Sequence, residues 1–136
     1  MNQDKLDGIF ISFFKNGNVK FIGYYKNHLK SGIWKEFYEN GILHKITNYE
    51  NNIKIANHKQ CYSNGSLYLE GSYKNDNLNG FFKEYYVSDN IFAKGNYKNG
   101  KYHGEYAMFD EDQDLIAKFY YDNGKSKYQF EYFQIN

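Results

Sequence analysis

The stretch from Tyr25 to Gly41, YKNHLKSGIWKEFYENG, contains the motif that decides the fold of this chain of 136 residues. Its glycine at position 32, with an aromatic residue two positions later, returns at positions 8, 80 and 104. Its first tyrosine and first asparagine return in every copy, as Tyr25, Tyr49, Tyr73, Tyr97 and Tyr121 and as Asn27, Asn51, Asn75, Asn99 and Asn123. A fixed interval of 24 residues without insertions indicates a tandem repeat, in which each unit contacts mainly its neighbours.

The repeat predicts a single elongated domain over residues 1–136. Residues 1–7 form a leader, five units follow, and residues 128–136 form a terminal half unit. The five units span residues 8–31, 32–55, 56–79, 80–103 and 104–127.

Turn residues predict that each unit is a β-hairpin. Asn-Gly pairs supply the positive φ angles that a tight type I′ turn needs. They occur at Asn16-Gly17, Asn40-Gly41 and Asn64-Gly65. We expect the first strand of the first unit over about residues 8–14 and its second strand over about residues 19–25.

The second strand has an apolar face in units one, three and four. In the first unit this face is formed by Val19, Phe21, Gly23 and Tyr25, which follow one another at period two. A glycine inside a strand destabilises a sheet unless something packs over the bare backbone, so we expect a neighbouring aromatic ring to cover it. The glycines concerned are Gly23, Gly71 and Gly95.

The first strand favours aromatic residues at two positions of opposite parity, represented by Phe10 and Phe13. Either both faces of the sheet are partly buried or a bulge shifts the phase. Successive reversals of the chain predict an all-β fold, an elongated, twisted, single antiparallel meander of stacked β-hairpins with about 11 strands and little or no helix. We expect the exposed sheet edge to pair with another chain, as a homodimer or with a partner's strand.

Three stretches, residues 25–41, 73–86 and 97–109, closely resemble the bacterial variant of the MORN repeat, MORN_2, with the form Tyr-x-x-Gly-x-x-x-Gly-x-Trp-x-x-Tyr-Tyr-x-x-Gly. The resemblance covers nearly the entire chain and implies a non-enzymatic sheet of stacked MORN-type hairpins. Many bacterial proteins with this variant resemble the YwqK-type antitoxins. The chain departs from the pattern in unit three, which has Ala56, His58 and Cys61, and in unit five, where residues 110–114 replace the Asn-Gly turn.

Composition excludes several classes of function. Seventeen basic and sixteen acidic side chains give a formal net charge of +1, so we expect no nucleic-acid partner. The chain shows no apolar secretion signal and no window long enough for a membrane-spanning helix, which predicts a soluble cytoplasmic protein that is not integral to a membrane. The single cysteine, Cys61, excludes an intramolecular disulfide.

No constellation of residues predicts catalysis, a cofactor or a metal. His58 and Cys61 lie three residues apart but occupy positions that other units fill with rings, so we interpret them as packing substitutions; a zinc site also needs three or four ligands. Glu36 and Glu84 lie two units apart, roughly 19 Å in a regular sheet, which is too far for a glycosidase pair. We therefore predict that the protein is not an enzyme.

The tyrosines and other rings are scaffold first, but those that stay exposed predict a binding surface. The candidate partner-binding residues are Trp34, Tyr38, His58, Tyr62, Phe82, Tyr86 and Tyr106. A notch at His58, flanked by Trp34, Tyr62 and Phe82, is the candidate pocket. The leading hypothesis is a protein-binding module, in the form of an antitoxin or immunity protein that covers a cognate protein such as a toxin. The alternatives are a glycan-binding aromatic surface and a peripheral membrane-associated scaffold.

Overall fold

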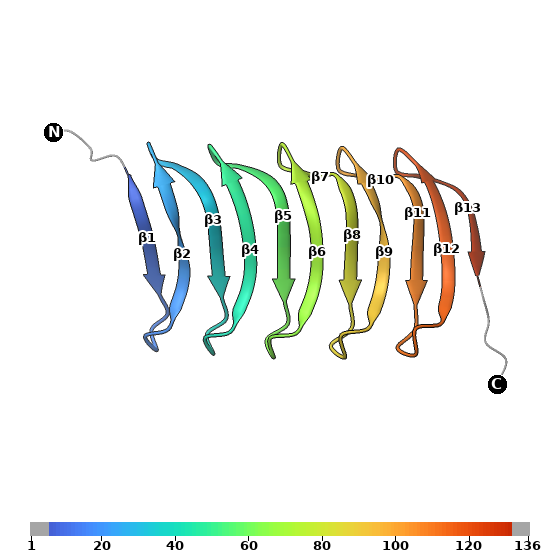
Figure 1. The fold of residues 1–136 in the computed structure, drawn as a ribbon, viewed down its shortest axis with the longest axis horizontal. Coiled ribbons are helices and arrows are strands. Elements are labelled where there is room, and N and C mark those ends of the chain that lie inside the picture. The colour runs from blue at the N-terminus through green and yellow to red at the C-terminus, as the bar shows by residue number, and fades with distance from the viewer. Residues whose placement is uncertain (1–5, 132–136) are drawn as a thin grey trace.

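The computed structural model describes residues 6–131. They form one open antiparallel sheet whose strands follow one another in chain order (Figure 1). The main path of the sheet contains eleven strands, and two further strands of two residues each pair at its side. No helix occurs within residues 6–131. The predicted all-β meander of about 11 strands is confirmed, while the outer parts of the predicted leader and half unit, residues 1–5 and 132–136, lie outside the described residues.

Each unit contributes a first strand and a second strand. The first strands are β1 (Gly8–Phe13), β3 (Leu29–Phe37), β5 (Ile53–Cys61), β8 (Gly80–Tyr85), β11 (Gly104–Phe109) and β13 (Lys125–Glu131). The second strands are β2 (Val19–Lys26), β4 (Leu43–Glu50), β6 (Leu67–Lys74), β9 (Ile91–Lys98) and β12 (Leu115–Asp122). The short strands β7 (Asn77–Leu78) and β10 (Lys101–Tyr102) precede β8 and β11.

The turns that join one unit to the next have positive φ at both central residues. Asn27 has a φ of 51° and His28 a φ of 67°, and Lys26 pairs with Leu29 across the turn. Two such residues in a two-residue loop make a type I′ turn, in which asparagine is favoured. The same turn recurs at Asn51-Asn52, Asn75-Asp76, Asn99-Gly100 and Asn123-Gly124. This geometry explains the asparagine that every unit contains.

The Asn-Gly pairs inside the units predict type I′ turns, and this prediction is wrong. In the first unit the Gly17 N–H donates to the Phe14 carbonyl (3.0 Å), and Gly17 has a φ of 93° whereas Asn16 has no positive φ. The loop is therefore a type I turn followed by one left-handed residue. Asn16 contributes through its side chain, whose Oδ1 accepts the N–H of Asn18 (3.0 Å).

A bulge in each second strand decides which side chains share a face. Ser12 pairs with Phe21 and Phe13 pairs with Val19, so Lys20 is an extra residue in β2. The same shift recurs in the four following hairpins. Because directly paired residues point to the same side of a sheet, Val19 lies on the opposite face from Phe21. The predicted apolar face of the second strand is broken at this bulge, and aromatic residues of the first strand lie on both faces.

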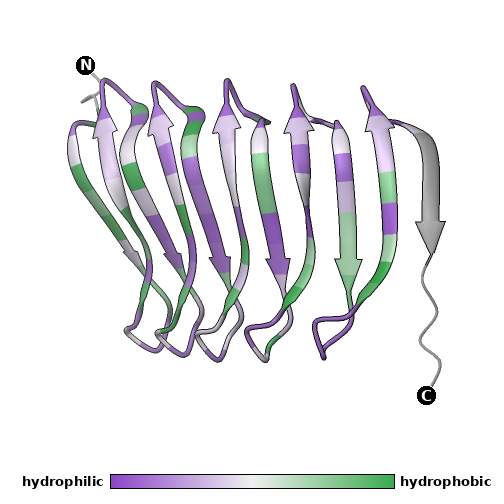
Figure 2. Ribbon diagram, turned by 45° about the vertical axis from the view of Figure 1, so that its right-hand side comes forward, coloured by the Kyte–Doolittle hydropathy of each residue, from purple (hydrophilic) through white to green (hydrophobic). Residues whose placement is uncertain are grey.

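The sheet is a single layer, and within residues 6–131 no second layer covers either face (Figure 1). Hydrophobic segments lie on the strands, while the turns at both ends are mostly hydrophilic (Figure 2). Burial must therefore come from large side chains that lie flat over neighbouring strands. The small core that results contains Trp34, Phe82, Ala93, Ala107 and Ala117.

Candidate functional site

One face of the sheet, which we call the ring face, carries a row of residues from the middle of the strands. Directly paired positions place in this row Phe10, Gly23, Trp34, Thr47, His58, Gly71, Phe82, Gly95, Tyr106 and Phe119. The tyrosine of each unit borders the row; the ring centroids of Tyr25 and Trp34, for example, lie 5.0 Å apart in an edge-to-face arrangement.

Rings on this face cover the strand glycines at the junctions, where the second strand of one unit meets the first strand of the next. A Cβ atom added to Gly23 would lie 2.1 Å from the Trp34 ring, and one added to Gly95 would lie 2.9 Å from the Tyr106 ring. At Gly71 the nearest atom would be Cβ of Phe82, at 3.4 Å. The prediction that a neighbouring ring covers the strand glycine is confirmed at Gly23 and Gly95, whereas Gly71 lies against Cβ of Phe82 and the Leu78 side chain.

His58 fills the same place at the second junction, where the opposing residue is threonine. Its Nδ1 lies 2.9 Å from Oγ1 of Thr47 and its Nε2 lies 3.0 Å from Nε2 of Gln60. An amide nitrogen only donates, so Nε2 accepts and the imidazole proton sits on Nδ1, which donates to Thr47. Burial, and then the charges of Lys54 and Lys45, lower the pKa of His58 to about 4. The imidazole is a neutral packing group.

A second set of rings links units two, three, four and five in succession through hydroxyl groups. Tyr38 donates to the carbonyl of Cys61 (2.7 Å), Tyr62 to that of Tyr85 (2.6 Å) and Tyr86 to that of Phe109 (2.8 Å). Burial raises the pKa of all three tyrosines. These hydroxyls therefore remain neutral donors to the backbone.

The structure places the seven candidate partner-binding residues in internal contacts. Trp34, His58 and Phe82 are buried, with exposed fractions of 6%, 4% and 2%. Tyr38, Tyr62, Tyr86 and Tyr106 are half-buried. Their partner-binding role stays a prediction, and the large hydrophobic residues that are exposed lie mostly on the opposite face, which the sequence did not indicate as a surface.

The opposite face, which we call the lysine face, contains three parallel rows. An apolar row runs along the strand ends near the bulges and contains Phe13, Val19, Phe37, Leu43, Cys61, Leu67, Tyr85, Ile91, Phe109 and Leu115. A central row contains Ile11, Ile22, Lys35, Ile46, Lys59, Glu70, Lys83, Lys94, Ala107 and Lys118. A third row contains Ile9, Tyr24, Ile33, Asn48, Asn57, Ser72, Phe81, Asn96, Glu105 and Tyr120.

The exposed large hydrophobic residues gather on the lysine face. Ile9 is 75% exposed, Phe13 60% and Ile33 57%, and Ile11, Tyr24 and Phe81 are also exposed. The other exposed large hydrophobics among the described residues, Leu6, Ile53 and Val87, lie at a strand end or in a loop, and none belongs to the ring-face row. All of the exposed large hydrophobics of the lysine face except Phe81, which is on β8, lie together on β1, β2 and β3, and contiguous exposed apolar side chains of this kind mark interaction surfaces.

The central row concentrates positive charge. Among the described side chains, the rows of this face contain five lysines and two glutamates, although the whole chain has a net charge of only +1. Lys118 pairs with Glu105 at 3.2 Å, and the ammonium of Lys83 lies 5.0 Å from the centroid of the Phe81 ring. From β3 to β12 the lysines extend over roughly 34 Å at the usual strand spacing.

Hollows on the lysine face lie behind the strand glycines. One of about 330 Å³ is lined by Ile9, Ile22, Gly23, Tyr24, Ile33 and Lys35. Another of about 400 Å³ at unit three is lined by Asn57, His58, Lys59, Glu70, Gly71, Ser72 and Phe81. The candidate notch at His58 therefore corresponds to a hollow on the lysine face, and the predicted flanking rings do not line it.

Titratable groups of this face form structural contacts. The Tyr85 hydroxyl donates to Oε1 of Glu70 at 2.7 Å. Burial and this hydrogen bond raise the pKa of Tyr85 to about 12. His58 and Cys61 lie on opposite faces, because Cys61 pairs with Leu67 in the apolar row. Among the described residues no group of three or more potential metal ligands occurs, and no helix is long and apolar enough to cross a membrane.

Parts of the chain are similar to a known repeat family. The family model of the MORN repeat variant matches residues 6–27, 30–51 and 113–134. The first two segments contain the hairpins β1–β2 and β3–β4, and the third contains β12 and β13. MORN repeats are generally protein- or membrane-binding modules rather than catalytic ones. A search of curated proteins found no match.

Proposed function

We propose that this array of MORN-type hairpins is a non-catalytic module that binds another protein on its lysine face. The observation that supports this most is the gathering of exposed Ile9, Ile33, Phe13 and their neighbours on one uncovered face. Such side chains, beside half-buried apolar residues, provide the desolvated centre that protein interfaces need. The ring face has its largest side chains engaged in inter-unit packing.

The lysine row indicates the chemistry of the partner. A protein with carboxylates beside apolar side chains complements both the central row and the apolar row. Lysine stems lie on apolar surface while their ammonium groups stay in water, so the two rows act as one amphipathic strip. The expected partner therefore has an acidic, partly apolar surface.

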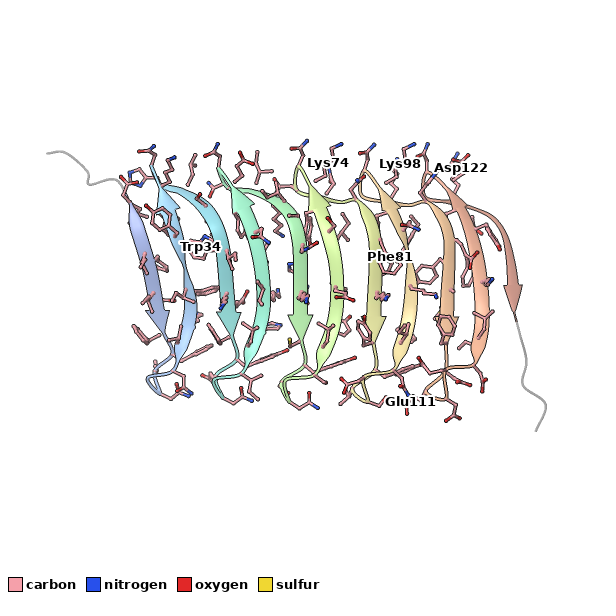
Figure 3. All side chains as sticks on the ribbon, viewed as in Figure 1. Trp34, Lys74, Phe81, Lys98, Glu111 and Asp122 are labelled. Atoms are coloured by element: carbon pink, nitrogen blue, oxygen red, sulfur yellow. The ribbon has the colours of Figure 1, made fainter. Side chains whose placement is uncertain are left out.

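A matched pair of variants tests this proposal. The lysine-face variant reverses the net charge of the central row by the changes Lys35→Glu, Lys59→Glu and Lys83→Glu. The turn variant makes the same change of charge beside the type I′ turns, by Lys26→Glu, Lys74→Glu and Lys98→Glu. Figure 3 shows Lys74 and Lys98 at these turns. Affinity capture followed by mass spectrometry should recover a protein with the wild-type chain and with the turn variant. The lysine-face variant should capture at least tenfold less of this protein than the wild-type chain does. Added salt should reduce the amount that the wild-type chain captures. Equal capture by both variants would refute the proposal.

We further propose that binding inhibits the partner by covering its working surface in the cytoplasm, as an antitoxin or immunity protein does. The resemblance to the YwqK-type antitoxins and the length of the lysine face support this form of the function. The test uses a captured partner with a measurable activity, titrated with the chain. Suppression at one-to-one stoichiometry is expected, and full activity in the bound complex would contradict occlusion.

Binding to an anionic membrane is a second candidate, because lysines beside apolar residues also suit that surface. Co-sedimentation with vesicles containing phosphatidylserine, compared with pure phosphatidylcholine vesicles, separates the two. Sedimentation with the anionic vesicles that is lost in the lysine-face variant would favour the membrane. Glycan binding through the Trp34 ring is not supported, since that ring is buried.

A further inference from the structure

The first strand, β1, has a neighbour on one edge only. It pairs with β2, and within residues 6–131 no strand lies on its other side (Figure 1). Its sequence, GIFISF, contains neither a charged residue nor a proline. These are the residues that usually protect an edge strand from pairing with another chain.

Every other first strand from β3 to β11 has that same edge occupied. The occupant is the second strand of the preceding unit, which pairs antiparallel: β2 with β3, β4 with β5, β6 with β8 and β9 with β11. The repeat thus contains four examples of a strand that pairs with the edge equivalent to the free edge of β1.

A ring and a small residue meet at each of these junctions. The Trp34 and Tyr106 rings project over Gly23 and Gly95, Cβ of Phe82 lies against Gly71, and at the remaining junction His58 meets Thr47. Phe10 is the equivalent ring of β1. It contacts Tyr25 and Trp34, with ring centroids at 5.5 Å and 6.0 Å, but within the described residues no preceding strand offers a glycine to it.

We propose that the free edge of β1 binds an extended segment of a partner protein, antiparallel, with a glycine in the position that faces Phe10. The segment adds one strand to the sheet by main-chain hydrogen bonds, and the glycine provides room for the Phe10 ring. The residues on either side of that glycine would lie beside Ile9 and Ile11 on the lysine face.

A second copy of this chain fits the edge less well than a partner segment. The strands that carry the required glycine, β2, β6 and β9, are paired on both sides within the sheet. The other edge strand, β13, has the sequence KSKYQFE, and β1 has glycine only at its first residue. Neither presents a glycine in mid-strand to Phe10 of another copy.

Binding at the edge of β1 is separate from the proposed function of the lysine face, because it depends on main-chain pairing and one ring and does not involve the lysines. The probe is the acetylated and amidated peptide LYLEGSYK, the sequence of β6, whose Gly71 is covered by a phenylalanine in the sheet. The control peptide is LYLEVSYK. Titration into the ¹⁵N-labelled chain is followed by amide chemical shifts, up to millimolar peptide.

We expect shifts confined to β1 and its neighbour β2, and affinity at least tenfold lower for the valine peptide. The Phe10→Ala variant, if its spectrum shows an intact sheet, should bind both peptides equally. The lysine-face variant should bind LYLEGSYK as the wild-type chain does, which separates this test from that of the proposed function. Absence of shifts in β1, equal binding of the two peptides by the wild-type chain, or β1 shifts that depend on protein concentration alone would overturn the proposal, the last in favour of a homodimer.

Discussion

The first and second junctions of the sheet occupy the same place in the repeat but are packed in two different ways. At the first junction the indole of Trp34 lies over Gly23, and its Nε1–H donates to the Tyr24 carbonyl at 3.1 Å. At the second junction Thr47 takes the place of the glycine, and the smaller imidazole of His58 takes the place of the indole. The space at the junction is therefore filled in both units, although the residues that fill it differ.

The difference has energetic consequences. The Gly-Trp junction depends on apolar burial and close contact, whereas the Thr-His junction depends on a hydrogen bond between two buried polar groups. The first should respond to changes in volume, and the second should respond to pH. The following predictions test this contrast.

The largest effect is expected from removing the indole. Trp34→Ala should lower the free energy of unfolding by about 3–5 kcal/mol, because it deletes a buried aromatic side chain and uncovers Gly23. Urea unfolding followed by tyrosine fluorescence measures it. The control is Ile33→Ala, whose exposed side chain on the other face should contribute about 0.5 kcal/mol or less. Similar losses in the two variants would show that the ring face is not the core.

A methyl group at the glycine tests the closeness of the ring. Gly23→Ala should destabilise the chain by about 1–3 kcal/mol, because the added Cβ would overlap the Trp34 ring, which must move. Gly71→Ala, where the nearest atom would be 3.4 Å away, should cost clearly less in the same denaturation series. A reversed order would contradict the packing described for the first junction.

Acid should weaken the second junction specifically. His58 has a folded-state pKa of about 4, below the ordinary value, so the unfolded chain takes up a proton first as the pH falls. The stability that His58 contributes is complete above about pH 6.5 and is lost progressively towards pH 4, by about 1 kcal/mol over the first unit of pH. Unfolding of the wild-type chain and of His58→Gln across this range gives the difference. Parallel pH curves for the two proteins would refute a neutral buried imidazole.

The smallest change in the free energy of unfolding is expected from a substitution at Ala56, at the second junction. Ala56 has a φ of 55°, in the position where the other units have glycine, and left-handed alanine is strained. Ala56→Gly should therefore raise the free energy of unfolding by about 0.5–1 kcal/mol. Gly32→Ala, where an added Cβ meets nothing within 4 Å, should lower it by a similar amount. A destabilising Ala56→Gly would show that the alanine side chain has a packing role.

Periodicity and turn chemistry allowed the sequence to predict much of the fold. The interval of 24 residues predicts the stacked hairpins, and the strand glycines predict the covering rings. The prediction of the type I′ turns names the wrong loops, because an Asn-Gly pair also suits a type I turn with a left-handed third residue. Unit five keeps that loop without glycine, since Gln113 adopts a φ of 67° and Oδ1 of Asp110 accepts the N–H of Asp114 at 3.0 Å.

The candidate site was less accessible to sequence reasoning. In a single-layer sheet the large rings lie over neighbouring strands, so Trp34 and Phe82 are buried although no second layer covers them. The bulge moves Val19 to the face opposite Phe21, and a strict period of two cannot show this. The signal that could have found the lysine face is the recurrence of lysine at equivalent positions, Lys35, Lys59 and Lys83.

Hydroxyl-radical footprinting of the chain, free and bound to the protein it captures, compares the two faces in one experiment. Oxidation of exposed Phe13 and Phe81 on the lysine face should be strong in the free chain and should fall several-fold in the complex. Oxidation of buried Trp34 and Phe82 on the ring face should be low in both states. Protection confined to ring-face residues, with the lysine face equally oxidised in both states, would contradict binding on the lysine face.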